Sequence, residues 1–170
     1  MIFFTSDTHF GHGGALGFYR RPFASVGEME EAMVARWNET VGPGDEVWHL
    51  GDFAIQPKPG RVEALLERLN GTKRLVAGNN DPPGTREAAG WASVADYAEL
   101  ELDGTRLVLC HYPFRAWNGM AKGAVNLHGH SHGRGKPLPR QIDVGVDVWG
   151  FRPMSLAALL AGRKAKGAAA

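Results

Sequence analysis

A chain of 170 residues, with 44% hydrophobic and 22% charged side chains, has the composition of one globular domain that can bury a real core. The formal net charge of +1 argues against intrinsic disorder and gives no signature of nucleic-acid binding. No apolar run is long enough to span a membrane, and we expect no signal sequence in residues 1–5. A single cysteine, Cys110, excludes an internal disulfide, so we expect a cytoplasmic protein without a membrane partner.

The N-terminal half alternates between strand-like and helix-like segments. Residues 2–5 form a short apolar run that predicts a strand, and the glycine-rich residues 11–17 predict a loop. Ser25 followed by Glu28 is a capping-box pattern, which predicts a helix from there to about Val41. A second strand over 46–50, a helix over 61–69 and a third strand over 73–77 complete a β-α-β-α-β order.

The C-terminal half indicates antiparallel pairing. Strand-like runs at 94–102 and 105–110 flank Asp103-Gly104, a dipeptide typical of a tight hairpin. Further strands are predicted at 125–128 and 141–146, followed by a helix over 155–160. We therefore expect a layered α/β fold with two β-sheets packed face to face and helices outside. We expect one domain over residues 1–162 and a frayed tail over 163–170.

Polar side chains follow five of the apolar runs within a few residues of their ends. In α/β sheets ligands gather at the carboxyl ends of the strands, so these positions favour one common site. Taken singly, each pattern is also typical of a turn residue or a surface histidine, and only their joint occurrence points to a site. The candidate residues are Asp7, His9, Asp52, Asn79, His111, His130 and His132.

The residue types favour a metal centre. Carboxylate, amide and imidazole donors without thiolate suit Mn, Fe, Zn or Ni rather than Ca or a structural zinc, and Mn²⁺ is our leading candidate. We hypothesise that Asp52 is shared by two divalent ions, which gives each ion four protein ligands. Two such ions about 3.5–4 Å apart stabilise the attacking and leaving oxygens of a displacement at phosphorus.

The ordered motifs Asp7-Thr8-His9, Gly51-Asp52, Gly78-Asn79-Asn80-Asp81, His111 and Gly129-His130-Ser131-His132 resemble the calcineurin-like metallophosphoesterase superfamily. The resemblance implies a β-sandwich flanked by helices and hydrolysis of a phosphate ester by a metal-bridging hydroxide. It places Asp7, His9 and His132 on the first metal ion, Asn79, His111 and His130 on the second, and Asp52 between the two ions.

One position departs from the family pattern. Members usually have Gly-Asn-His-Asp where this chain has Asn80 in the third place, and a carboxamide cannot act as a general acid, although it can donate a hydrogen bond to a phosphoryl oxygen. His12 is our candidate for a substitute proton donor, and Arg115 is our candidate for binding the phosphate. A solvent-facing histidine and a surface charge are the alternatives. His49 and His128 are interpreted as packed or supporting groups.

Two functions remain open from the sequence. The first is a metal-dependent phosphoesterase with an open site for a phosphodiester or a phosphomonoester. The second is a catalytically weakened protein of the same fold that acts as a binding scaffold, like the retromer subunit that resembles these enzymes. Asn80 favours the scaffold, whereas the complete set of seven ligand types favours the enzyme. The substrate, the native metals and the oligomeric state are not predicted.

Overall fold

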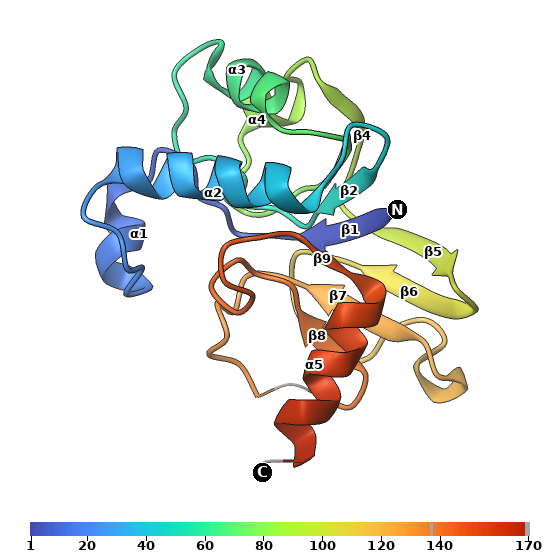
Figure 1. Cartoon of the computed structure of the whole chain (residues 1–170). Helices are drawn as coiled ribbons and strands as arrows, with labels where there is room; N and C mark the ends of the chain where they lie inside the picture. The colour runs from blue at the N-terminus through green and yellow to red at the C-terminus, as the bar shows by residue number, and fades with distance from the viewer. Residues whose placement is uncertain (137, 169–170) are drawn as a thin grey trace.

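The computed structural model describes residues 1–136 and 138–168, with side chains described up to residue 162. Its centre is a pair of facing β-sheets (Figure 1). The five-stranded sheet has the order β4-β3-β2-β1-β9, in which β1 to β4 are parallel and β9 is antiparallel to β1. Its strands are β1 (Ile2–Thr5), β2 (Glu46–His49), β3 (Thr72–Val76), β4 (Trp91–Ala95) and β9 (Met154–Ser155).

The four-stranded sheet has the order β5-β6-β7-β8, in which only the β5–β6 pair is antiparallel. Its strands are β5 (Ala98–Leu102), β6 (Thr105–Leu109), β7 (Val125–His128) and β8 (Gln141–Asp143). The β5–β6 hairpin turns through Asp103 and Gly104, whose φ angles of 50° and 70° match the tight turn predicted for this dipeptide. The prediction of two packed sheets is confirmed.

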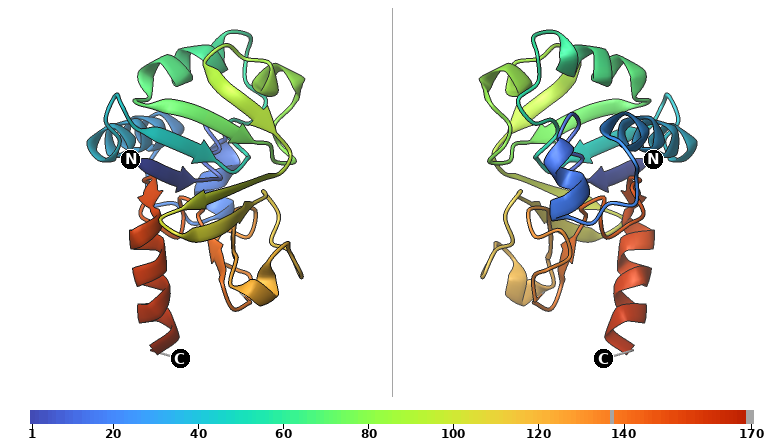
Figure 2. Two further views of the ribbon diagram at one scale, coloured as in Figure 1. Left: turned by 90° about the vertical axis from the view of Figure 1, so that its right-hand side faces the viewer. Right: turned by 90° about the vertical axis from the view of Figure 1, so that its left-hand side faces the viewer.

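The helices lie outside the sheets. Figure 1 shows α2 and α3 on one side of β1, and the four-stranded sheet with α5 on the other side. In both views of Figure 2 the C-terminal half of α5 extends away from the two sheets. None of the helices in the described part of the chain combines the length and hydropathy of a membrane span. The helices are α1 (Gly13–Phe18), α2 (Val26–Thr40), α3 (Arg61–Arg68), α4 (Pro83–Arg86), the 3₁₀ turn η1 (Met120–Lys122) and α5 (Leu156–Ala168).

The core forms on both faces of the five-stranded sheet because side chains alternate along a strand. Phe3 of β1 belongs to the cluster that packs against α2 and α3, whereas the next residue, Phe4, belongs to the cluster between the two sheets. Both phenylalanines are buried. Because both faces of the sheet are buried, the sequences of its strands are nearly continuous apolar runs without clear alternation.

The capping box is present: Ser25 accepts a hydrogen bond from the Glu28 backbone N–H at 3.1 Å, and the Glu28 carboxylate accepts from the Ala24 N–H at 2.8 Å. The predicted loop over 11–17 is wrong, because α1 forms there. Ala15 is fully buried in the core cluster, and this packing outweighs the low helix propensity of the glycines around it.

The run at 94–102 is not one strand. It divides between β4, which pairs with β3 in the five-stranded sheet, and β5, which pairs with β6 in the other sheet. Asp96 and Tyr97 connect the two and are exposed. Strand propensity is similar before and after the chain passes from one sheet to the other, so the local sequence does not reveal this change of sheet. The last helix is also longer than the predicted 155–160, and residues 169–170 of the predicted tail lie outside the described residues.

Candidate metal centre

The seven predicted ligands lie on loops that follow β1, β2, β3, β6 and β7. Backbone hydrogen bonds join the first two of these loops, from the Asp7 N–H to the Gly51 carbonyl at 2.9 Å and from the His9 N–H to the Asp52 carbonyl at 3.0 Å. Parallel strands end at the same edge of a sheet, and the facing sheet brings its own loops to that edge. The predicted residues therefore converge, as expected.

One group of potential ligand atoms comprises Asp7, His9 and His132, and their donor atoms all lie within 4.8 Å of one another. The Asp7 Oδ1 atom is 3.9 Å from His9 Nε2 and 3.7 Å from His132 Nε2. The Asp7 and His9 side chains are buried, and His132 is partly exposed. We call these three residues the first half of the centre.

A second group comprises Asp7, Asp52 and His111, again with donor atoms within 4.8 Å of one another. His111 Nε2 is 3.1 Å from the Asn79 Oδ1 atom. The His130 ring lies 5.1 Å from the His111 ring, and its backbone N–H donates to both Asp7 oxygens at 3.0 and 3.2 Å. We call Asn79, His111 and His130 the second half.

Asp52 lies between the two halves. Its Oδ2 atom is 3.5 Å from His9 Nε2, and its Oδ1 atom is 3.6 Å from His111 Nε2. One oxygen thus faces each half, which is the arrangement that a shared carboxylate requires.

In two of the histidines, a hydrogen bond at Nδ1 determines which ring nitrogen is protonated and which can bind a metal ion. His132 Nδ1 lies 2.7 Å from the Asp147 carboxylate, and His111 Nδ1 lies 2.7 Å from the Leu50 carbonyl. Both partners are acceptors, so Nδ1 carries the proton and Nε2 carries a lone pair. That lone pair faces an Asp7 oxygen in one half and the Asn79 oxygen in the other. Two facing acceptors repel each other unless a cation lies between them, so these residues fit bound metal ions.

Burial of the imidazoles also favours metal binding. His9 Nε2 is buried without a hydrogen-bond partner among the described residues, although two carboxylates surround it. Burial lowers the pKa of His9 to about 2 and also lowers that of His111, so both imidazoles are neutral and able to bind a metal. Burial raises the pKa of Asp7 well above its usual range, and Asp143 and Asp52 raise it further. Divalent ions would offset this cost by stabilising the carboxylate.

The backbone of the centre is strained. Left-handed φ angles are uncommon outside glycine and cluster at functional sites. Two glycines are also required sterically: a Cβ at position 78 would lie 2.3 Å from Asp52 Oδ1, and one at position 129 would lie 2.5 Å from Asp7 Oδ2. Five predicted ligands have positive φ: Asp7 at 57°, His9 at 51°, Asp52 at 59°, His130 at 64° and His132 at 46°.

Sequence reasoning missed the groups that hold the first half. The Arg21 side chain is buried and donates to both Asp147 oxygens at 2.8 and 2.9 Å, while Asp147 binds His132. The same guanidinium donates to the carbonyl oxygens of Asp7 at 2.6 Å and Thr8 at 2.8 Å. Burial disfavours ionisation of Asp147, but the hydrogen bonds from His132 and Arg21 outweigh burial and lower its pKa. No local motif marks this pair.

Asp81 holds the second half. Its carboxylate accepts the backbone N–H groups of Asp52 and Gly78 at 2.8 Å and that of Phe53 at 2.9 Å. It therefore joins the loop after β2 to the loop after β3. Burial raises the pKa of Asp81, although the three N–H bonds oppose the rise. Sequence analysis placed Asp81 in the Gly78-Asn79-Asn80-Asp81 motif but gave it no role.

Asn80 contacts the carboxylate between the two halves. Its backbone N–H donates to Asp52 Oδ1 at 2.9 Å, and its side-chain Nδ2 donates to Asp52 Oδ2 at 2.7 Å. The position that departs from the family pattern thus positions Asp52. His12 lies beside His9, with 3.3 Å between their Nδ1 atoms, and burial lowers the pKa of His12.

The remaining candidates differ in their surroundings. Arg115 is exposed and forms no hydrogen bond or ion pair with the described residues, so the structure does not bring it to the centre. His49 and His128 are buried, and His49 Nε2 lies 3.0 Å from the Thr8 hydroxyl in the first ligand loop. Tyr19, which sequence reasoning also missed, stacks on His132 with ring centroids 3.5 Å apart and planes at 10°. Its position at the end of α1 gave no sequence signal.

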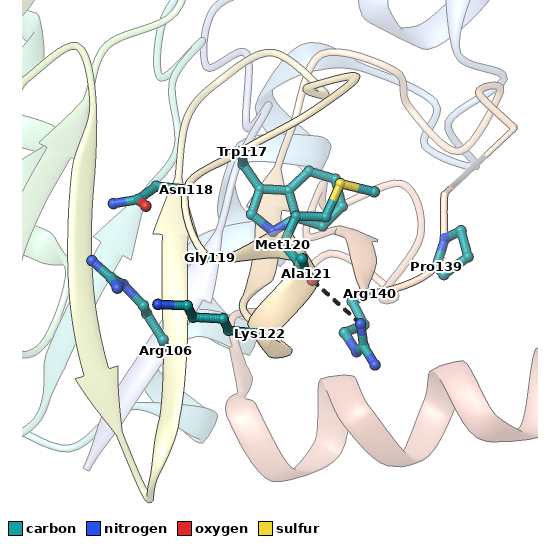
Figure 3. Close-up of a pocket in the computed structure, with 9 residues that line it drawn as sticks. All are labelled: Arg106, Trp117, Asn118, Gly119, Met120, Ala121, Lys122, Pro139 and Arg140. Atoms are coloured by element: carbon teal, nitrogen blue, oxygen red, sulfur yellow. Dashed lines mark hydrogen bonds between the residues drawn. The ribbon is translucent and has the colours of Figure 1, made fainter.

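A separate hollow of about 590 Å³ contains none of the predicted ligands (Figure 3). Trp117 and Met120 form its apolar wall, and Arg106, Lys122 and Arg140 surround it. Arg106 lies on the face of β6 opposite to the cluster between the sheets, because Leu107 belongs to that cluster. The hollow is thus on the outer face of the four-stranded sheet.

Comparisons with known proteins agree with this architecture. An uncharacterized protein of Methanocaldococcus jannaschii is 31% identical over 163 residues, covering 91% of this chain and 86% of that protein. The structure of a protein of unknown function from Aquifex aeolicus is similar, with a TM-score of 0.74, 23% identity and coverage of 91% of this chain and 94% of that chain. A solved archaeal phosphodiesterase has a TM-score of 0.50 and 23% identity, covering 85% of this chain and 81% of that chain. These two structures are evidence for the fold.

The sequence itself also matches a family model. The model of the calcineurin-like phosphoesterase superfamily domain matches residues 1–153, which include every predicted ligand. The chain therefore belongs to the calcineurin-like phosphoesterase superfamily.

Proposed function

We propose that this protein is a dinuclear metal-dependent phosphoesterase that hydrolyses a phosphodiester or a phosphomonoester. The observation that carries the proposal is the position of Asp52, whose two oxygens lie 3.5 Å from His9 Nε2 and 3.6 Å from His111 Nε2. Divalent ions at such a centre supply an activated water and positive charge that stabilises the transition state. Mn²⁺ is the ion that we would test first, with Fe, Zn and Ni as alternatives.

The protein groups have separate tasks in this proposal. Asp7, His9 and His132 would hold one ion, Asn79, His111 and His130 would hold the other, and Asp52 would be shared by the two. Asn80 fixes the orientation of the Asp52 carboxylate through the hydrogen bonds at 2.9 and 2.7 Å, so that one oxygen is directed to each half. Asp7, His9, Asp52 and His111 are buried, which excludes water from these ligands and strengthens their attraction to a cation, whereas Asn79 and His130 are exposed.

Protonation of the leaving group falls to a residue other than Asn80. Its amide cannot supply a proton, and the hydrogen bond to Asp52 already uses one of its N–H groups. We assign this role to His12, which is partly exposed and adjacent to His9. Loss of a general acid typically lowers the rate by about 10²–10⁴. Arg115 stays a candidate for phosphate binding only if its exposed side chain turns toward the centre.

The test is hydrolysis by protein loaded with Mn²⁺. Bis(4-nitrophenyl) phosphate and 4-nitrophenyl phosphate are compared as substrates for the wild type, Asp52→Ala, His12→Ala and Asn80→His. We expect Asp52→Ala to abolish activity on both esters. Phenyl phosphate, which has a poorer leaving group, tests the general acid: His12→Ala should lower its hydrolysis more than that of 4-nitrophenyl phosphate. Increased activity of Asn80→His would show that proton donation limits the wild type.

The alternative function is a binding scaffold, which Asn80 favours. It predicts that the wild type binds about two equivalents of Mn²⁺ yet is no more active than Asp52→Ala on either ester. That result would reject the enzyme. Wild-type activity that depends on both Mn²⁺ and Asp52 would reject the scaffold as the sole function.

A further inference from the structure

We propose that the substrate is a nucleotide ester whose base stacks on exposed aromatic side chains at the two sides of the metal centre, Tyr112 and Phe18. The inference rests on the proposed function and specifies the substrate class of the same site. Among the described residues, the exposed Phe, Tyr and Trp side chains are Phe18, Tyr97 and Tyr112. Tyr112 lies against two histidines of the centre, and Phe18 lies against His12, the candidate proton donor.

Tyr112 borders the second half. Its ring centroid lies 5.1 Å from that of His111 and 4.9 Å from that of His130, with planes at 73° and 67°. The side chain is nevertheless 45% exposed, so a large part of the ring is available to a ligand at the centre. The ring therefore presents an aromatic face beside the centre on which a planar group of a ligand can stack.

Phe18 contacts His12, which lies beside the first half. Its ring lies 6.0 Å from His12, whose own ring lies 5.3 Å from His9. The Phe18 side chain is 66% exposed. The adjacent Arg134 side chain donates to the Phe18 carbonyl and forms no ion pair with the described residues, so its charge is available to a phosphate.

The combination of groups identifies the ligand class. Divalent ions held at the centre would attract the phosphate group of a ligand. The aromatic rings beside the centre would stack on planar groups attached to that phosphate. Aromatic side chains stack on any nucleobase, because every base has a π-face. A long nucleic-acid strand is less suitable than a small nucleotide, because the formal net charge of +1 gives little attraction for many phosphates.

The hollow on the outer face of the four-stranded sheet is the competing place for a nucleotide. Trp117 could contact a base there, and Lys122 and Arg140 form no ion pairs with the described residues (Figure 3). However, Trp117 is only 8% exposed and already donates to the Ala124 carbonyl at 2.9 Å. The Phe18 and Tyr112 rings are much more exposed than Trp117, so the metal centre is favoured.

The experiment compares ligands that differ only in a base. Binding of AMP and ribose 5-phosphate to the Mn²⁺-loaded protein is measured by titration calorimetry. We expect the wild type to bind AMP about 10-fold more tightly, which is a modest value for stacking. Tyr112→Leu and Phe18→Leu should each reduce this preference, Tyr112→Phe should keep it, and Arg140→Ala should leave it unchanged.

Equal affinity for the two ligands in the wild type, or loss of the preference in Arg140→Ala instead of Tyr112→Leu, would overturn the inference. Hydrolysis distinguishes it from the proposed function. Thymidine 5′-(4-nitrophenyl) phosphate and methyl 4-nitrophenyl phosphate share a leaving group, and we expect a higher kcat/KM for the first that Tyr112→Leu lowers. If neither ester is hydrolysed while the AMP preference persists, the proposed catalysis fails and the base-binding inference holds.

Discussion

The two halves of the candidate metal centre are held by different chemistry. In the first half, an ion pair of buried side chains fixes His132 and the backbone of the Asp7 loop, through Arg21 and Asp147. In the second half, His111 is fixed by a backbone carbonyl, and Asp81 binds three backbone N–H groups. One half thus depends on charge neutralisation between side chains, and the other depends on backbone hydrogen bonds.

This difference predicts how each half fails. A buried ion pair loses most when one partner is removed, because the other charge stays buried and unpaired. Buried N–H groups without an acceptor cost less individually, but several are affected together. Removing one partner of the ion pair in the first half should therefore destabilise the fold more than removing the Asp81 carboxylate in the second half.

Arg21→Leu should have the largest effect. It leaves Asp147 buried without its cation and removes the two bonds to the ligand loop, so we expect the free energy of unfolding to fall by about 3–5 kcal/mol. The double variant Arg21→Leu/Asp147→Leu should lose less than the single variant, because it removes the unpaired charge. Urea unfolding of both variants, with exposed Arg20→Leu as the control, measures the effect. A single variant as stable as the wild type would show that the ion pair is not important.

Asp81→Ala should rank next. Three backbone N–H groups lose their acceptor, and each buried unsatisfied group costs about 1–3 kcal/mol unless water replaces the carboxylate. We expect a loss of about 3 kcal/mol in the free energy of unfolding, together with loss of hydrolysis. Glu87→Ala, at an exposed position nearby, is the control in the same unfolding assay. Normal stability together with normal activity would mean that the two loops hold their positions without Asp81.

Asp147→Asn should weaken metal binding, and it should cost less folding stability than Arg21→Leu because the amide oxygen still accepts a hydrogen bond from Arg21. An amide holds His132 less strongly than a carboxylate, and loss of such a supporting group typically lowers metal affinity about 10–100-fold. We expect one of two Mn²⁺ ions to bind more weakly and the other to keep its affinity. Calorimetric titration and electron paramagnetic resonance of the bound Mn²⁺ detect this asymmetry, with Asp103→Asn in the hairpin turn as the control. Equal weakening of both ions would contradict the separation into halves.

The comparison also explains what the sequence could predict. The candidate ligands were identified because each follows an apolar run within a few residues, which is a local signal that the parallel topology converts into proximity. The confirmed capping box at Ser25 and the hairpin at Asp103-Gly104 are equally local. The assignment of each ligand to a metal ion stays a prediction.

The missed features depend on contacts that are distant in sequence. Arg21 and Asp147 are 126 residues apart, and neither belongs to a motif. The change of sheet between β4 and β5 depends on tertiary pairing rather than on strand propensity, and α1 depends on the burial of Ala15. Each of these features is stabilised by packing against a partner that the local sequence does not name.

Tyr19→Leu should give the smallest effect and would refine the description of the first half. The ring stacks on His132 at 3.5 Å but accepts none of its hydrogen bonds, so it restricts the imidazole only by packing. Aromatic contacts of this kind contribute about 0.5–1.5 kcal/mol, which corresponds to roughly 2- to 10-fold in Mn²⁺ affinity. Tyr19→Phe keeps the ring and should bind Mn²⁺ like the wild type in the same titration. A loss for Tyr19→Leu as large as that for Asp147→Asn would mean that packing, rather than the hydrogen bond to Asp147, orients His132.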